Sequence, residues 1–142
     1  MDSANLQKII TDYLSTIDGV GKVSFSIDYS DGKMVGGKFI VNSNTGDKLT
    51  TFNLSAMVGC NGVAISNGVV IYSQFRGKGL AAQFIELREI IATAMGFGVM
   101  MCTVVVGNKP QERAMIKRGW RIISVFQNPR TKNEVQMFFK KL

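Results

Sequence analysis

VVIYSQFRGKGLAAQ, residues 69–83, is the stretch of this sequence that decides the fold. It runs from β-branched residues typical of a strand into a glycine-containing loop, and the loop opens directly into residues typical of a helix. Free N–H groups and the positive end of the helix dipole converge at such a junction, which makes it a ready anion site. Gly77 and Gly79 lack a Cβ, so their backbone can approach phosphate oxygens, and Arg76 and Lys78 add positive charge. The stretch predicts a phosphate-binding loop, with a plain flexible turn as the alternative.

Spacing separates this loop from two common phosphate-binding motifs. A P-loop needs GxxxxGK followed by Ser or Thr, which the sequence lacks, and this excludes P-loop triphosphate chemistry. The segment 77–82 does match G-x-G-x-x-A, the dinucleotide fingerprint. That fingerprint also needs an acidic residue after the next strand, whereas the next predicted strand ends in Gly107-Asn108, and antiparallel hairpins precede the loop. We therefore reject the dinucleotide interpretation.

The N-terminal segment predicts an amphipathic helix. Apolar residues between Leu6 and Ile17 recur with the spacing of one helical face. Asp2 or Ser3 supplies the N-cap, and Gly19 supplies a C-terminal stop.

The next fifty residues predict an antiparallel meander of four strands, between residues 23 and 72. The hydrophobic period changes to two, and Asp31-Gly32 and Asn61-Gly62 have the residues of tight hairpin turns. We interpret Ser66-Asn67-Gly68, inside the last strand, as a β-bulge, with a second hairpin turn as the alternative.

The loop is followed by a predicted helix over residues 80–96. Gly96 and Gly98 close it. Its apolar stripe consists of Leu80, Phe84, Leu87, Ile91 and Ala94. The polar positions opposite this stripe are Gln83, Glu86, Glu89 and Thr93.

A strand, a helix and a hairpin complete the chain. VMMCTVVVG, residues 99–107, is a nearly continuous apolar run, typical of a central strand buried on both faces and parallel to the strand ending at Tyr72. A short helix then has Pro110 in its first turn and Gly119 just past its end. The last two strand-like segments are RIISVFQ and VQMFFKKL, residues 121–127 and 135–142.

Composition fits one α+β domain over residues 1–142. The apolar fraction is 46% and the charged fraction 19%, ordinary values for a globular domain of 142 residues. The net charge of +7 lies in the second half, because residues 1–71 carry five Lys and six Asp, whereas residues 72–142 carry twelve Lys and Arg and four Glu. An anionic ligand is therefore expected to meet the second half.

The reactive residue types exclude several kinds of site. The chain has no His, which excludes His-dependent triads and His-containing metal sites, and we predict no metal. Cys60 and Cys102 lie in apolar strand-like segments without CxxC spacing, so both are expected to be reduced core thiols. The sequence has no run of eighteen apolar residues and no signal-peptide pattern, so we expect a soluble cytoplasmic protein without membrane contact.

Two motifs, correctly ordered, resemble those of the GNAT superfamily of N-acetyltransferases. Gln74-Phe75-Arg76-Gly77-Lys78-Gly79 fits the Q/R-x-x-G-x-G/A motif that holds the pyrophosphate of acetyl-CoA in that family. Asn108 followed by Gly119-Trp120 resembles the family's "N … Y-x-x-x-G-F" helix, with Trp in place of Phe. The resemblance covers roughly residues 63–142. It implies a GNAT-like fold, with a mixed and mostly antiparallel sheet of about six or seven strands flanked by three helices.

The resemblance also implies a function and a cofactor site. The chain would transfer an acetyl group from acetyl-CoA to a primary amine by direct attack on the thioester. Main-chain groups of Val70, Ile71 and Tyr72 would pair with the pantetheine arm, and Asn108 would hydrogen-bond the pantetheine or the backbone where two parallel strands splay apart. The amides that would hold the pyrophosphate are those of Arg76, Gly77, Lys78, Gly79, Leu80 and Ala81.

The catalytic residues cannot be assigned from this resemblance. The family's usual general acid is a Tyr seven residues after the Asn, and Met115 stands there. Tyr72 and Ser73 are candidate substitutes, since they are close in sequence to the proposed thioester. No carboxylate lies in the segment 61–85, so the general base would be water, nothing, or a distant residue such as Asp28 or Glu112.

The sequence leaves the activity, the partners, the acceptor and the oligomeric state open. Met115 and the missing base leave room for a non-catalytic module that binds acyl-CoA, a protein or nucleic acid. The basic residues near Trp120 have two interpretations, a solvated helix whose charge attracts the phosphates of CoA and a nucleic-acid-binding surface, and we favour the first. The acceptor could be a small molecule, a protein or an aminoacyl-RNA, and the last strand could form the edge of a homodimer.

Overall fold

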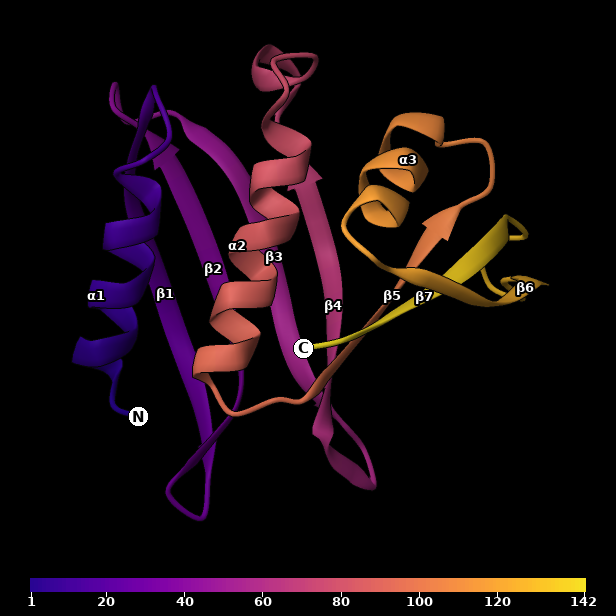
Figure 1. Cartoon of the computed structure of the whole chain (residues 1–142), viewed down its shortest axis with the longest axis horizontal. Helices are drawn as coiled ribbons and strands as arrows, with labels where there is room; N and C mark the ends of the chain where they lie inside the picture. Colours follow the sequence, from indigo (N-terminus) through magenta and orange to yellow (C-terminus); the bar gives the residue numbers. More distant parts are fainter.

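The computed structural model spans residues 1–142; it describes all of them in full except Gly68, which it describes only as part of a strand. Seven strands form one sheet in the order β1-β2-β3-β4-β5-β7-β6. Figure 1 shows α1 and α2 side by side across the first four strands, with α3 beside them over the C-terminal strands. In chain order the elements are α1 (Ser3–Leu14), β1 (Val20–Ser30), β2 (Lys33–Ser43), β3 (Lys48–Met57), β4 (Cys60–Ile71), a short 3-10 helix η1 (Ser73–Phe75), α2 (Leu80–Ala94), β5 (Val99–Val105), α3 (Lys109–Lys117), β6 (Arg121–Gln127) and β7 (Glu134–Lys141).

This architecture confirms the predicted α+β class. The first four strands pair in antiparallel fashion, β4 and β5 are parallel, and β7 lies between β5 and β6. The predicted first helix, meander, second helix, third helix and final hairpin all form. No helix among the described residues is long and apolar enough to cross a membrane.

Local signals explain the first helix and the first turn. The side chain of Asp2 caps α1, because its Oδ1 accepts a hydrogen bond from the Asn5 N–H at 2.8 Å. Asp31 and Gly32 both have positive φ, 51° and 75°, as the tight turn between β1 and β2 requires.

The predicted turn at Asn61-Gly62 is wrong, because β3 and β4 turn at Val58-Gly59 instead. Met57 pairs with Cys60, which leaves two residues in the turn, and Gly59 supplies the positive φ of 80°. The shift also corrects the expectation for Cys60, which flanks the turn and is exposed, while Cys102 is buried as expected. Both thiols are free.

The predicted bulge in β4 is confirmed. Thr51 pairs with Val70 and Asn53 with Asn67, so β4 holds one residue more than β3 between these pairs. Gly68, the third residue of the predicted triplet, lies outside the fully described residues. A bulge bends the strand that carries it, and here it lies just past the point where β4 stops pairing with β5.

The core lies between the sheet and the helices. The rings of Phe39 and Phe52 stack at 5.0 Å between centroids beneath α1 and α2. In β5 the side chains alternate, with Cys102 and Val104 buried and Thr103 and Val105 exposed. The expectation that β5 is buried on both faces is therefore wrong, since the helices cover only one face of the sheet (Figure 1).

Candidate functional site

The segment between β4 and α2 forms an open loop at one end of the sheet. Gly77 and Gly79 adopt left-handed backbone conformations, with φ of 76° and 74°. Such conformations favour glycine, and a Cβ at either position would meet no atom within 4 Å, so the space above the loop is open. The loop therefore requires these glycines and leaves room for a ligand against its backbone.

The start of α2 offers unused hydrogen-bond donors. Gly79 is the N-cap residue, no side chain caps the helix, and its first turn contains no acidic residue. Among the described residues, no acceptor lies within hydrogen-bond distance of the Gly77, Lys78 or Gly79 N–H groups. The first N–H groups of any α-helix also lack partners in the helix. A row of N–H groups and the positive end of the dipole are thus free to bind an anion.

Two cationic side chains flank this loop. The Arg76 Nε donates a hydrogen bond of 2.8 Å to the Ile71 carbonyl, which ties the loop to the end of β4. The Arg76 N–H donates to the Ser73 carbonyl at 3.3 Å, so this one predicted phosphate-binding amide already has a partner. The Lys78 Nζ lies 5.5 Å from the centroid of the Phe75 ring, next to a hollow of about 230 Å³ that both residues line.

The strands that lead to this loop separate from each other. β4 and β5 pair only from Val63↔Val99 to Ile65↔Met101, although β4 continues to Ile71. Figure 1 shows the two strands adjacent at the bottom of the view and apart at the top, where the loop and α3 begin. The part of β4 that faces this splay is accessible, since Val70 is 42% exposed. Its main-chain groups on that side have no strand partner among the described residues.

The remaining predicted cofactor residues lie at the same end of the sheet. Ile71 and Tyr72 are half-buried, and the Tyr72 N–H is already bonded to the Leu49 carbonyl at 3.0 Å. Leu80 and Ala81 are half-buried in the first turn of α2. Asn108 is the exposed N-cap residue of α3, across the splay, and its side chain makes no capping hydrogen bond.

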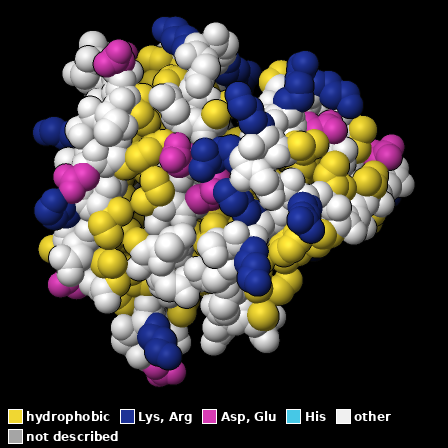
Figure 2. Space-filling view, viewed as in Figure 1, with side chains coloured by type: hydrophobic (Ala, Val, Ile, Leu, Met, Phe, Trp, Pro, Cys, Tyr) yellow, Lys and Arg dark blue, Asp and Glu magenta, His cyan; other side chains and the backbone are white. Residues whose placement is uncertain are grey.

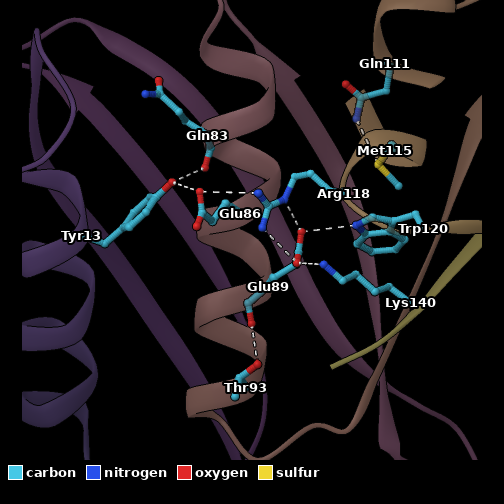
Figure 3. Close-up of polar contacts among 10 residues, drawn as sticks. All are labelled: Tyr13, Gln83, Glu86, Glu89, Thr93, Gln111, Met115, Arg118, Trp120 and Lys140. Carbon is cyan, nitrogen blue, oxygen red and sulfur yellow. Dashed lines mark hydrogen bonds and ion pairs between the residues drawn. The ribbon is translucent and has the colours of Figure 1, made fainter. Parts of the chain in front are cut away.

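Met115, which stands where the family has its acid, is a core residue. Its side chain is fully buried, and the Gln111 Nε2 lies 3.6 Å from its sulfur (Figure 3). Its carbonyl oxygen accepts hydrogen bonds from the Arg118 and Trp120 N–H groups at the end of α3. Met115 therefore holds α3 in place and offers no proton.

The structure does not bring the candidate acids and bases together. Asp28 is exposed on β1, with β2 and β3 between it and β4. Glu112 lies on α3 and pairs with Lys109 at 3.4 Å. Tyr72 and Ser73 lie at the end of β4, and neither hydroxyl has a hydrogen bond among the described residues.

The sequence did not predict two buried polar groups, one on α2 and one on β4. Arg88 of α2 is 3% exposed, and its Nε has no hydrogen-bond partner among the described residues. Ser66 of β4 is 5% exposed, and its Oγ also lacks a partner. Burial lowers the pKa of Arg88 and raises that of the Cys102 thiol to about 11, against the opposing effect of the nearby guanidinium. One signal in the sequence could have predicted the burial of Arg88: this charged residue lies four positions after Phe84, on the apolar stripe of the helix.

A second group of buried charges is centred on Glu89, the next residue of α2 (Figure 3). Its carboxylate accepts hydrogen bonds from the Arg118 Nε at 2.8 Å, from the Trp120 Nε1 at 3.3 Å and from the Lys140 Nζ. Burial alone would raise the pKa of Glu89, but the hydrogen bonds from Arg118 and Lys140 outweigh it and lower that pKa. The helical spacing predicted Glu89 on the polar face of the helix, and this prediction is wrong, because the carboxylate is buried with its partners.

Tyr13 extends this cluster to α1. Its hydroxyl lies 3.0 Å from the Glu86 Oε2 and 3.1 Å from the Gln83 carbonyl. Burial and the hydrogen bond to Glu86 raise the pKa of Tyr13. Arg118 also approaches Glu86, with 3.6 Å between Nη1 and Oε2. The cluster borders a cavity of about 490 Å³, and Figure 2 shows its basic and acidic side chains near the centre of that face. It joins α1, α2, the end of α3 and β7.

Comparisons with solved structures find the same fold. A GNAT family acetyltransferase from Elizabethkingia anophelis with acetyl-CoA bound has 9% identity and a TM-score of 0.69, over 89% of this chain and 100% of that one. An IAA acetyltransferase from Bacillus cereus has 12% identity and a TM-score of 0.68, over 85% and 100%. Nourseothricin acetyltransferase has 13% identity and a TM-score of 0.63, over 92% of each chain.

No protein-family model and no curated protein matches the sequence. At such low identities, the similarity to solved structures establishes the fold and leaves the activity to be argued from the site. The chain has the fold of the GNAT acetyltransferases, which confirms the fold that the resemblance of its Gln74–Gly79 and Asn108–Trp120 segments implies.

Proposed function

We propose that the chain is an N-acyltransferase that moves an acetyl group from acetyl-CoA to a primary amine by direct attack on the thioester. The observation that carries this proposal is the uncapped N-terminus of α2, behind two left-handed glycines, at the end of a splayed pair of parallel strands. A site with a row of free amides beside an open strand edge suits a ligand with a pyrophosphate and an extended amide-containing arm.

Each part of the site has a role in this proposal. The Gly77, Lys78, Gly79, Leu80 and Ala81 amides hold the pyrophosphate, and the Arg76 and Lys78 side chains add positive charge beside it. Main-chain groups from Val70 to Tyr72 pair with the pantetheine arm like an added strand, and the Asn108 side chain bonds the arm from the other side of the splay. The bound thioester supplies the activated acyl group.

The chemistry then needs little from side chains. A neutral amine attacks the thioester carbonyl, and a β4 N–H in the splay stabilises the developing oxyanion, worth about 2–4 kcal/mol when its geometry is good. The thiolate is a fair leaving group, so a dedicated acid is not required. This account fits a chain in which Met115 is buried and candidate bases lie apart.

Calorimetric titration with acetyl-CoA tests the cofactor site, with Gly79→Glu as the disabling variant. The substitution forces a side chain into a left-handed position and places a negative charge at the phosphate site. We expect affinity to fall by roughly 30-fold or more, about 2 kcal/mol, because charge-assisted hydrogen bonds to the phosphates are lost.

Gly59→Glu is the matched control for this variant. Gly59 has a φ of 80° and equally open surroundings, but it lies in the β3–β4 turn at the opposite end of β4. The control should bind acetyl-CoA like the wild type. Absence of binding by the wild type, or equal binding by Gly79→Glu, contradicts the proposed cofactor site.

A second candidate function is a non-catalytic module that binds acyl-CoA on the same fold. The buried Met115 and the separation of Asp28 and Glu112 from the splay favour it. Release of free thiol from acetyl-CoA in the presence of a panel of primary amines distinguishes the two. Amine-dependent release that Gly79→Glu abolishes supports the enzyme, whereas tight binding without release across the panel supports the module.

A further inference from the structure

Arg88 is a buried cation that forms no ion pair among the described residues; the Glu89 carboxylate acts on it only from beyond ion-pair distance. Its side chain is 3% exposed, yet its Nε has no hydrogen-bond partner among the described residues. None of the ion pairs within the described residues includes it. Burying a charge is costly unless it is paired and hydrogen-bonded, so this arrangement calls for an anion that binds from outside.

The surroundings of Arg88 place it at the base of the splay. Ile65 and Met101 are the last paired residues of β4 and β5, so Ser66 and Cys102 are the first residues past the point where the strands separate. Both are buried, at 5% and 8% exposure, between more exposed neighbours in their strands, which places them on the covered face of the sheet. Because α2 packs against β4, the buried Arg88 lies in the same layer between helix and sheet as Ser66 and Cys102. Its guanidinium opposes the rise in the pKa of the Cys102 thiol. The thiol stays neutral, because burial raises its pKa, so it is no counter-ion.

Ser66 adds a second unsatisfied group at this point. Its Oγ is buried without a hydrogen-bond partner among the described residues, although a hydroxyl can both donate and accept. A guanidinium and a hydroxyl donor together match a carboxylate, which can accept two parallel N–H bonds and one O–H bond.

Two independent paths lead from the phosphate loop to this place. Along α2, Arg88 lies nine residues after Gly79, about 13 Å at the rise of an α-helix. Along β4, Ser66 lies four residues before Val70, and because of the bulge these span only three residues of β3, about 10 Å at the rise of a strand. A donor whose pyrophosphate lies on the loop and whose arm follows β4 would therefore direct its acyl end towards Arg88 and Ser66.

We propose that Arg88 and Ser66 form a carboxylate-binding subsite for the distal carboxylate of a dicarboxylic acyl group, such as succinyl, carried on CoA. This rests on the proposed function and names the acyl class that the site prefers. In the transfer, the amine nitrogen bonds to the thioester carbonyl carbon and the C–S bond breaks with its electron pair going to sulfur. The proton lost by the amine ends on the departing thiol, and the product is an amide with a free carboxylate.

Calorimetric titration of the wild type and Arg88→Met with succinyl-CoA and acetyl-CoA tests the subsite. The wild type should bind succinyl-CoA at least about tenfold more tightly than acetyl-CoA, since a hydrogen-bonded charge pair of this kind adds a factor of that order. Arg88→Met should lose the preference and keep acetyl-CoA binding. Arg130→Met removes an equal charge from the exposed β6–β7 turn and should keep the preference.

Further variants separate a binding role from a merely structural one. Ser66→Ala should reduce the preference in part, and Arg88→Lys should keep part of it. Without ligand, Arg88→Met should raise Tm by about 3–5 °C, because it replaces an unpaired buried charge with an apolar side chain. A fall in Tm means that Arg88 is a structural residue and overturns the proposal.

The outcomes distinguish this proposal from the function on which it rests. Equal binding of both thioesters by the wild type overturns the donor subsite while the acyltransferase proposal stands. Binding of neither thioester overturns the proposed function itself. A rise in KM of Arg88→Met for amino acids, but not for their amides, with no donor preference, assigns the carboxylate to the acceptor and overturns the assignment to the donor.

Discussion

Arg88 and Glu89 are neighbours in α2, both buried, with opposite charges and opposite surroundings. Glu89 is 7% exposed and accepts hydrogen bonds from Arg118, Trp120 and Lys140. Arg88 is 3% exposed and forms no ion pair among the described residues, since Glu89 acts on it only from beyond ion-pair distance. A buried charge whose hydrogen bonds come from the chain itself stabilises the fold. A buried charge that lacks such hydrogen bonds is available to a ligand. We therefore assign different roles to the two residues: Glu89 stabilises the fold, and Arg88 binds a ligand.

The largest expected effect comes from removing Glu89. Glu89→Ala leaves Arg118 and Lys140 partly buried without their carboxylate and the Trp120 N–H without its acceptor. We expect the free energy of unfolding to fall by about 3–5 kcal/mol, the usual cost of breaking a buried pair from one side. Urea unfolding followed by circular dichroism measures it. Arg88→Met should change stability in the opposite direction, which makes the neighbouring residues a matched pair.

Glu134→Ala is the surface control for this variant. Glu134 is exposed at the start of β7 and makes no ion pair among the described residues. Its loss should change stability by less than about 0.5 kcal/mol. If Glu89→Ala costs no more than this control, the Glu89 cluster does not hold the elements together.

The pH dependence of stability is the second expected effect, because protonation removes the charge of Glu89 and keeps its side chain. The partners hold the folded pKa of Glu89 below its ordinary value of 4.5, which the unfolded chain retains. The stabilisation is therefore present above pH 4.5 and is lost as pH falls through the folded pKa. Unfolding midpoints measured from pH 7 downwards should fall in acid, and Glu89→Gln should make this fall shallower. Identical slopes for the two proteins would contradict the assignment.

Periodicity and turn chemistry predicted most of the fold, because these signals are local. The alternation of the strands, the Asp31-Gly32 turn and the Gly77-Lys78-Gly79 loop each depend on residues close together in the chain. The error at Asn61-Gly62 has the same origin. Val58-Gly59 also suits a two-residue turn, and only the pairing of β3 with β4 decides between them.

The two charges of α2 could not be assigned from the sequence, because their surroundings are built from distant segments. Lys140 lies fifty-one residues after Glu89, and only the position of β7 next to β5 brings the two together. The splay beside Arg88 likewise depends on where β4 and β5 stop pairing. A helical projection places both residues on α2, but it cannot tell which side of the helix meets a cation and which meets a gap between strands.

The smallest expected effect tests whether the Glu89 cluster extends to α1. Tyr13→Phe removes the hydroxyl that lies 3.0 Å from the Glu86 Oε2, at the edge of the cluster. We expect a loss of about 1 kcal/mol in the free energy of unfolding, the usual net value of one hydrogen bond. Tyr29→Phe is the control, because its hydroxyl bonds Ser3 at 2.9 Å on the exposed side of the molecule and should contribute less.

The alkaline limb of the stability profile tests the place of Tyr13 in the cluster further. Burial and Glu86 raise the pKa of Tyr13 above its ordinary value of 10.0, so its contribution is present below pH 10.0 and is lost as pH rises through the higher folded pKa. The wild type should therefore lose stability in strong alkali more steeply than Tyr13→Phe does. An alkaline slope of Tyr13→Phe equal to that of the wild type would mean that the cluster does not include Tyr13, and α1 would then be held by its apolar face alone, through Leu6, Ile10 and Leu14.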